Sequence, residues 1–228
     1  MNYRYLLFDA DNTLFDFDKC EKEAFLSLSD LDPIAFNDST FVLYHKINDE
    51  LWKKAEKGMI TKAALKTERF RLFFNSIGIC IDDQSVQNYA KEYVSRLSCQ
   101  NVLVEGAYGL LEYLYTYYDI YIITNGLASV QRKRFANSSI NKFIKGLFIS
   151  EEIGYDKPDV RYFIHVMSSI GSLDTSDYLI IGDSLSSDIK GAENAEIDSV
   201  YFNKSKVVTY SPTSKYNICS LGELKLVL

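Results

Sequence analysis

The stretch FDADNTLFDF, residues 8–17, ends an apolar run with two carboxylates that have one residue between them, Asp9 and Asp11. Like charges this close repel each other, and each loses hydration where a strand leaves the core. A divalent cation would relieve that repulsion, because Mg²⁺ prefers oxygen ligands and binds one or two carboxylates together with a substrate phosphate. We therefore expect this stretch to follow a buried strand and to carry the chemistry of the protein.

Composition limits the classes of protein to consider. The chain has 228 residues, of which 47% are hydrophobic, and 25 basic against 31 acidic residues give a net charge of −6. This balance argues against binding of a nucleic acid polymer, which needs a basic stripe. Four cysteines without C-x-x-C spacing predict reduced thiols, and no segment reaches the roughly 18 apolar residues of a membrane span. We expect a soluble, cytoplasmic protein with a small-molecule partner and no membrane contact.

Short apolar runs predict the strands of the core. Each ends on a polar residue followed by Gly, Asn or Ser, as buried parallel strands do. Helical patterns alternate with the runs, which predicts an α/β fold with a doubly wound, Rossmann-like parallel sheet. The predicted strands are 3–9, 120–124 and 178–183, with weaker candidates at 147–150 and 199–202.

Residues 18–98 show helical periodicity and no convincing strand. Helices are predicted at 41–58 and 61–78, each closed by a glycine. A helical block inserted after the first strand predicts a second, smaller domain. The expected division is a catalytic core of residues 1–16 and 99–228, with the insert at 17–98.

Ligands of open parallel sheets sit beyond the carboxyl ends of the strands. Asp9 and Asp183 follow two predicted strands and are candidate Mg²⁺ ligands. Asp9 is also the candidate nucleophile, because an ionised carboxylate can attack phosphorus to give an aspartyl-phosphate. Asp11 is the candidate general acid and base, since its side chain would be free of the metal.

The negative charge of a phosphoryl group also needs stabilisation. Lys157 offers a point charge, Thr124 a hydroxyl, and Asn125 an amide with a backbone N–H. The helix expected from Gly126 would favour an anion at its first turn. We expect Asp188 to orient Lys157 or metal-bound water.

Elsewhere, the segment RKRF at 132–135 predicts a solvated helix face. Arg69 and Lys53 of the insert are weak candidates to reach a substrate.

The ordered set D-x-D-x-T, T-N-G, K-P and G-D-x-x-x-x-D resembles the haloacid dehalogenase-like superfamily of phosphohydrolases. The resemblance implies that the helical insert is a mobile cap, Asp9 the nucleophile and Asp11 the general acid/base. It also implies that Thr124 and Lys157 bind phosphate, with Asp9, Asp183 and the backbone carbonyl of Asp11 at Mg²⁺. Dehalogenases of the superfamily lack the second aspartate, so Asp11 favours phosphoryl chemistry.

Four segments, DADNTLFDFD, LW at 51–52, ITNGLASVQ and ISEEIGYDKP, are similar to bacterial pyrimidine 5′-nucleotidases, which implies a nucleoside monophosphate as substrate. One departure is Asn12, where the wider superfamily often has Gly; it predicts a change in the turn that follows. A sugar-phosphate phosphatase or phosphomutase on the same scaffold is an open alternative. A phospho-accepting regulatory module is another, although it leaves the insert and Asp11 without a role.

Overall fold

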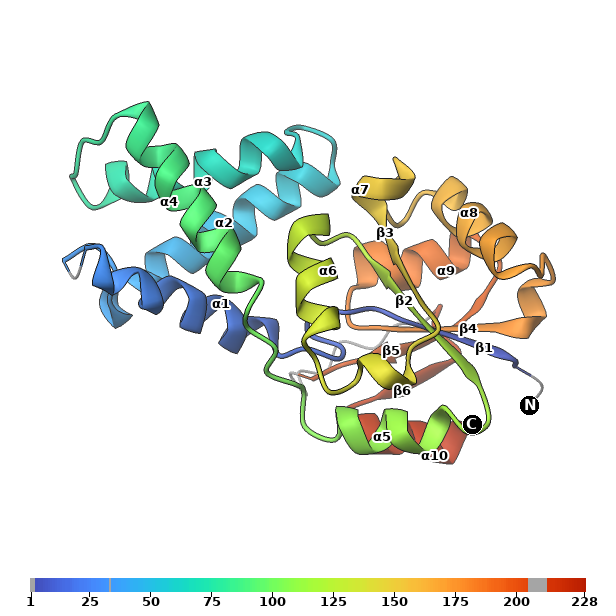
Figure 1. Ribbon diagram of the computed structural model, residues 1–228. Helices are drawn as coiled ribbons and strands as arrows, with labels where there is room; N and C mark the ends of the chain where they lie inside the picture. Colours follow the sequence, from blue (N-terminus) through green and yellow to red (C-terminus); the bar gives the residue numbers. More distant parts are fainter. Residues whose placement is uncertain (1–2, 33, 205–212) are drawn as a thin grey trace. The chain divides into compact units, whose positions relative to one another are not determined.

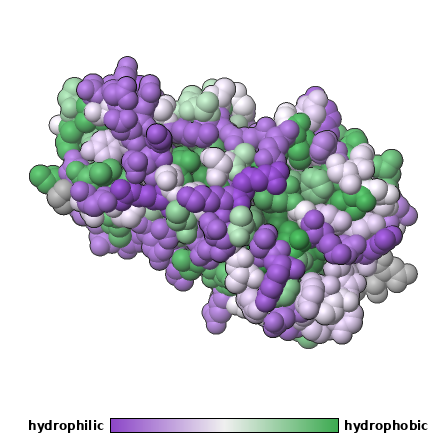
Figure 2. All heavy atoms as spheres, viewed as in Figure 1, coloured by the Kyte–Doolittle hydropathy of each residue, from purple (hydrophilic) through white to green (hydrophobic). Residues whose placement is uncertain are grey.

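The computed structural model describes residues 3–32, 34–204 and 213–228 of the chain. Two compact units make up the chain: the first combines Met1–Phe17 with Asn101–Leu228, and the second is Asp18–Gln100. Hydrophilic residues cover much of the face shown in Figure 2, as expected for a chain with 25% charged residues. Among the described residues, no helix is both long and apolar enough to cross a membrane.

The first unit contains a parallel sheet of six strands in the order β3-β2-β1-β4-β5-β6 (Figure 1). The strands are β1 (Tyr5–Phe8), β2 (Asp119–Thr124), β3 (Gly146–Ile149), β4 (Tyr178–Gly182), β5 (Asp198–Phe202) and β6 (Tyr216–Ile218). The predicted α/β fold is therefore confirmed. The short edge strand β6 was not predicted, because three residues, two of them partly exposed, give too little apolar pattern to identify a strand.

Alternate residues of β1 face opposite sides of the sheet, as the strand period of two requires. Leu6 and Phe8 belong to one apolar cluster, which includes buried residues of α5 and α10. Tyr5 and Leu7 belong to another, with buried residues of α8 and α9. Helices thus cover both faces of the sheet (Figure 1). These helices are α5 (Ala107–Leu114), α6 (Ala128–Ala136), α7 (Ser150–Ile153), α8 (Val160–Ile170), α9 (Lys190–Asn194) and α10 (Leu224–Val227).

The register of the three central strands aligns their carboxyl ends. Phe8, the last residue of β1, pairs with Ile122 of β2 and with Ile181 of β4. The residues that follow these strands consequently lie at one edge of the sheet, which is where the candidate site is built.

The second unit is helical, with α1 (Phe17–Ser27) leading into it from the first unit and α2 (Asp38–Glu56), α3 (Lys62–Ser76) and α4 (Asp83–Leu97) completing it. Asn37 begins α2 with a capping box. Gly58 and Gly78 follow α2 and α3 at φ values of +68° and +75°, in the left-handed region that glycine adopts most readily. The two helices predicted for this segment therefore end as the glycines indicated.

A buried polar network lies inside this helical unit. Glu21 accepts hydrogen bonds from Asn48 (2.7 Å) and contacts Nδ1 of His45 (2.5 Å), while Asn48 accepts one from Arg69 (3.2 Å). Arg69 is 1% exposed and stacks on the ring of Tyr93, 4.3 Å from the centroid. The expectation that Arg69 reaches a substrate is wrong, because its guanidinium is buried in the core of its own unit.

Short helical turns complete the described chain. They are the 3₁₀ turns Leu28–Asp30, Asn141–Phe143, Thr175–Asp177 and Leu221–Glu223, and the π-helical turn Leu185–Ile189.

Candidate active site

A buried lysine joins the strand ends. Lys157 is 1% exposed, and its ammonium donates to Asp9 Oδ1 (2.7 Å), Asp188 Oδ1 (2.6 Å) and the carbonyl oxygen of Ile123 (3.0 Å). Asp9 directly follows β1, and its N–H donates to Ile181 of β4 at 2.9 Å. A desolvated charge is tolerated only when it is paired and hydrogen-bonded, and Lys157 has three partners. The structure thus brings Lys157 and two of the predicted acidic residues together.

Asp188 is held in place by the motif that precedes it. Both of its carboxylate oxygens are engaged, Oδ1 by Lys157 (2.6 Å) and Oδ2 by the N–H of Ser184 (3.0 Å). Gly182 leaves room for this carboxylate, since a Cβ at that position would lie 2.3 Å from Asp188 Oδ2. Asp188 therefore contacts Lys157 directly, in the orientation expected for a residue that positions the lysine.

The electrostatics of the cluster follow from burial and crowding. Burial raises the pKa of Asp9 well above its usual value against the opposing effect of Lys157, and the carboxylates of Asp188 and Asp183 add to the rise. Burial and the charge of Asp188 raise the pKa of Asp183 to about 7. Burial lowers the pKa of Lys157, but Asp188 and Asp9 outweigh it and raise that pKa overall. The carboxylates thus carry more negative charge than one lysine can balance.

The donor set fits a divalent cation. Asp9, Asp183 and Asp188 each offer a carboxylate oxygen, and the three oxygens lie within 4.8 Å of one another. Oxygen donors at one strand edge suit Mg²⁺, and a cation there would offset the burial and the mutual repulsion that raise the pKa values of Asp9 and Asp183. The backbone carbonyl of Asp11 stays a predicted ligand.

Asp11 is separated from this cluster by its own partners. Its side chain is 27% exposed and pairs with Arg134, and Gln131 donates to its Oδ2 at 2.6 Å. The next residue, Asn12, has φ +61°, a left-handed conformation that glycine adopts without strain and asparagine tolerates. This explains how Asn12 replaces the glycine of the wider superfamily without breaking the turn.

Thr124 is the last residue of β2 and Asn125 follows it, as predicted. The Thr124 hydroxyl accepts from the N–H of Gly126 at 3.0 Å. The Asn125 side chain makes two 2.9 Å hydrogen bonds to the backbone N–H and carbonyl of Lys157. Its amide therefore holds the Lys157 loop, and phosphate binding by Thr124 and Asn125 stays a prediction.

Three polar residues of the site were given no role from the sequence, although Thr13 belongs to the D-x-D-x-T motif. The Thr13 hydroxyl donates to Asp183 at 3.4 Å, and Gln131 and Arg134 both engage Asp11. The interpretation of 132–135 as a solvated helix face is wrong for Arg134, which is completely buried. The available signal was the spacing of Gln131 and Arg134, three residues apart on the helix after T-N-G, which puts them on one helix face.

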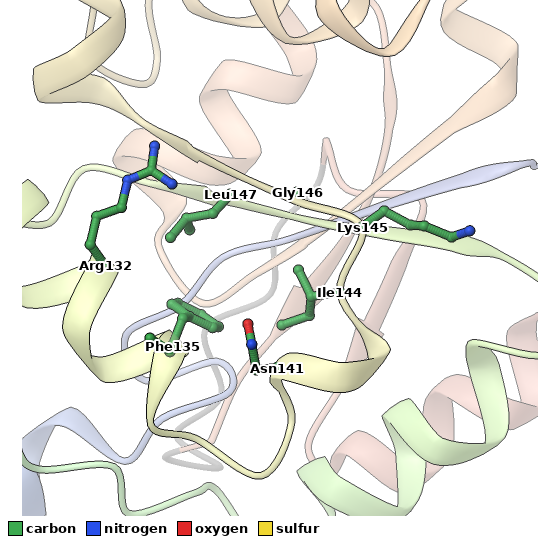
Figure 3. Close-up of a pocket in the computed structure, with 8 residues that line it drawn as sticks. Arg132, Phe135, Asn141, Ile144, Lys145, Gly146 and Leu147 are labelled. Atoms are coloured by element: carbon green, nitrogen blue, oxygen red, sulfur yellow. The ribbon is translucent and has the colours of Figure 1, made fainter.

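A separate pocket lies between α6 and the edge strand β3 (Figure 3). It has a volume of about 330 Å³ and is lined by Arg132, Phe135, Ala136, Asn141, Ile144, Lys145, Gly146 and Leu147. Its cations are already paired, Arg132 with Glu152 at 2.5 Å and Lys145 with Asp119 at 3.5 Å. None of the predicted site residues lines it, so it is distinct from the strand-end cluster.

The fold and the strand-end carboxylates agree with the comparison to known families. Residues 6–202 match the haloacid dehalogenase-like hydrolases, and the chain belongs to that family. The resemblance found in the sequence is confirmed.

Three bacterial relatives match most of the chain. YfnB of Bacillus subtilis (strain 168), which is named a HAD-hydrolase, is 34% identical over 99% of this chain and 95% of its own. The pyrimidine 5′-nucleotidase PynA of Streptococcus pneumoniae is 34% identical over 89% of this chain and 85% of its own. The pyrimidine 5′-nucleotidase YjjG of Escherichia coli (strain K12) is 29% identical over 100% of this chain and 99% of its own. These relatives support a phosphoric monoester hydrolase.

The crystal structure of YfnB, bound to magnesium, resembles the whole chain. Its TM-score is 0.90 at 33% identity, with 100% of this chain and 99% of that chain covered. The two proteins therefore share both the sheet and the helical unit.

Proposed function

We propose that this protein is a Mg²⁺-dependent phosphomonoesterase that hydrolyses pyrimidine nucleoside 5′-monophosphates through an aspartyl-phosphate. One observation carries the proposal: Lys157 is buried between Asp9 and Asp188, with Asp183 beside them and Asp11 held apart by other partners. Two carboxylates two residues apart in such different surroundings suit two different chemical roles.

In the proposed first step, Asp9 attacks the phosphorus atom of the ester through Oδ2, the oxygen not engaged by Lys157. A bond forms between this oxygen and phosphorus while the bond to the ester oxygen breaks. Asp11 donates a proton to the departing oxygen, which leaves as the alcohol. A bound Mg²⁺ would supply positive charge that keeps Asp9 ionised and offsets the charge of the phosphoryl group.

The proposed second step regenerates the enzyme. Asp11, now ionised, takes a proton from a water molecule as that water attacks the phosphorus atom. The bond between phosphorus and the Asp9 oxygen breaks, and inorganic phosphate leaves. Lys157 and the Thr124 hydroxyl, with the backbone N–H of Asn125, would stabilise the phosphoryl oxygens in both steps.

We propose that the helical unit is a cap that selects the substrate and excludes bulk water. The predicted boundaries of 17–98 for this cap stay a prediction. The choice of a pyrimidine nucleotide is supported by PynA and YjjG, which are named for this substrate class. The free state of the four cysteines is in keeping with the proposed cytoplasmic location.

A substrate panel tests the proposal. Phosphate release would be measured from dUMP, dTMP, UMP, AMP, glucose phosphates and a nitrophenyl phosphate, with Mg²⁺ or with EDTA, beside Asp9→Asn. The proposal predicts Mg²⁺-dependent release that is greatest with the pyrimidine nucleotides and lost in Asp9→Asn.

The alternatives give other results in the same panel. A preference for sugar phosphates would keep the mechanism and replace the substrate class. Transfer of the phosphoryl group to a second hydroxyl in place of water would indicate a mutase. A long-lived phosphorylated protein with no turnover would indicate a regulatory module and refute the proposed hydrolysis.

A further inference from the structure

Arg134 is a completely buried arginine that forms an ion pair with Asp11. Its side chain is 0% exposed, it lies 5.1 Å from the ring centroid of Phe15 and 5.9 Å from that of Phe17, and one Nη donates to Asp11 Oδ1. Among the described residues, its Nε and second Nη have no hydrogen-bond partner. In the part of the chain that the structure describes, Arg69 of the helical unit also leaves two donors unpaired, but its hydrogen-bond partner is the amide of Asn48. Arg134 differs because its ion pair is with Asp11, the predicted general acid/base.

Gln131 holds the other oxygen of the same carboxylate. It is 1% exposed, and its Nε2 donates to Asp11 Oδ2 at 2.6 Å and to the Thr124 hydroxyl at 3.3 Å. Gly126 makes this reach possible, since a Cβ there would lie 2.3 Å from Gln131 Nε2. The glycine of the T-N-G motif therefore serves the contact between Gln131 and Asp11.

Together the two side chains fix the plane of the Asp11 carboxylate. They lie three residues apart on α6, on one face of the helix, and each binds a different oxygen. A carboxylate oxygen has two lone pairs, so each oxygen keeps one for the proton that Asp11 exchanges. Because Asp11 is 27% exposed, the held carboxylate stays reachable by a substrate.

We propose that Arg134 and Gln131 are positioning residues that orient Asp11 for both proton transfers, a role that rests on the proposed function above. Neither residue exchanges the proton itself; each acts through its hydrogen bond to the Asp11 carboxylate. They orient the Asp11 carboxyl so that its proton points at the ester oxygen in the first step. In the second step the same orientation lets the carboxylate take a proton from the attacking water. A well-placed general acid or base contributes about 10²–10⁴ in rate, and loss of orientation removes part of that contribution.

The test compares leaving groups that need different amounts of protonation. Arg134→Lys, Arg134→Met and Gln131→Leu would be assayed with dUMP, whose leaving alkoxide needs a proton, and with nitrophenyl phosphate, whose phenolate leaves without one. Lys133→Met is the matched control, because Lys133 is exposed on the same helix. We expect kcat with dUMP to fall at least about tenfold with KM within about threefold.

With nitrophenyl phosphate, the first turnover should be nearly normal in these variants, and the steady-state rate should fall. The reason is that phosphorylation of Asp9 then needs no acid, while hydrolysis of the aspartyl-phosphate still needs the base. A burst of nitrophenolate is therefore predicted for Arg134→Lys and Gln131→Leu. Equal losses with both substrates in the first turnover would overturn the positioning role.

A double-mutant cycle separates positioning from folding. In an Asp11→Asn background, Arg134→Lys should change kcat less than about twofold, because no carboxylic proton is left to orient. Losses that multiply independently would overturn the proposal. If Arg134→Met fails to fold, Gln131→Leu decides the question by the same cycle. Turnover that survives in Asp9→Asn would instead refute the proposed function, whatever the behaviour of Arg134.

Discussion

Replacing Lys157 with methionine removes the cation that pairs with both Asp9 and Asp188 and keeps most of the apolar side-chain stem. The ammonium makes three contacts of 2.6–3.0 Å, and the side chains of Asp9 and Asp188 are 10% and 1% exposed. Removing one partner of a buried ion pair typically costs about 3–5 kcal/mol, because the remaining charge stays desolvated. We expect a loss of this size in the free energy of unfolding at about pH 8.

The loss should depend on pH in one direction. Lys157 has a raised pKa, so its stabilisation is fully present below its unfolded value and it stays charged between about pH 5 and 8. Without it, the pKa of Asp9, already raised, rises further. A carboxyl with a raised folded pKa destabilises the fold increasingly as pH rises from its unfolded pKa to its folded pKa. The further rise of the Asp9 pKa in the variant extends that range upward, so the deficit of the variant should be smaller at about pH 5 than at about pH 8.

Urea unfolding in EDTA at the two pH values measures the loss in unfolding free energy of Lys157→Met relative to the wild type. Lys133→Met is the control for losing an exposed lysine. Adding Asp188→Asn to Lys157→Met should recover part of the loss, because it removes one of the two unbalanced charges. A loss below about 1 kcal/mol at both pH values, the size expected of a surface pair, would refute the reasoning.

Three further predictions concern stability. Gly182→Ala places a Cβ 2.3 Å from Asp188, so it should lower the free energy of unfolding in urea by about 1–3 kcal/mol and reduce phosphate release. Gly109→Ala is the control: a Cβ there has nothing within 4 Å among the described residues, so both quantities should stay unchanged. The pKa of His45 is raised by its glutamate partner, so its stabilisation is present below about pH 6.5 and lost as pH rises further. In His45→Gln the free energy of unfolding should therefore fall less steeply with rising pH than in the wild type. Parallel pH profiles of the two proteins would contradict this prediction. Asp183→Asn should stabilise the metal-free protein more at about pH 8 than at about pH 5, because the pKa of Asp183 is raised to about 7 and its destabilising effect grows as pH rises from the unfolded pKa toward that value. Mg²⁺ should raise the thermal midpoint of the wild type and not of Asp183→Asn.

The sheet was predictable because its strands carry local signals. β1 and β4 are apolar runs that are buried along their whole length, and a motif aspartate, Asp9 or Asp183, directly follows each. Parallel strands bring their carboxyl ends to one edge, so the proximity of Asp9 and Asp183 follows from topology alone. The edge strand β6 was missed because its three residues depend on pairing with β5 for their conformation.

The partners of Asp11 could not be predicted in the same way. A buried arginine and an exposed one look alike in sequence, and Arg134 lies within a run of charged residues that resembles a solvated face. Arg69 illustrates the same limit in the helical unit, where a charged residue occupies an aromatic core. Tertiary contacts decide such cases, since only they pay for the desolvation of a charge.

The most direct test of the proposed mechanism is acid-quench mass spectrometry of the peptide that contains Asp9. Wild type, Asp11→Asn and Asp9→Asn would be mixed with nitrophenyl phosphate and Mg²⁺ and quenched during turnover. We predict a single phosphoryl group on Asp9 in the wild type, more of it in Asp11→Asn because hydrolysis is slowed, and neither adduct nor turnover in Asp9→Asn. Turnover without any adduct, together with activity in Asp9→Asn, would contradict covalent catalysis by Asp9.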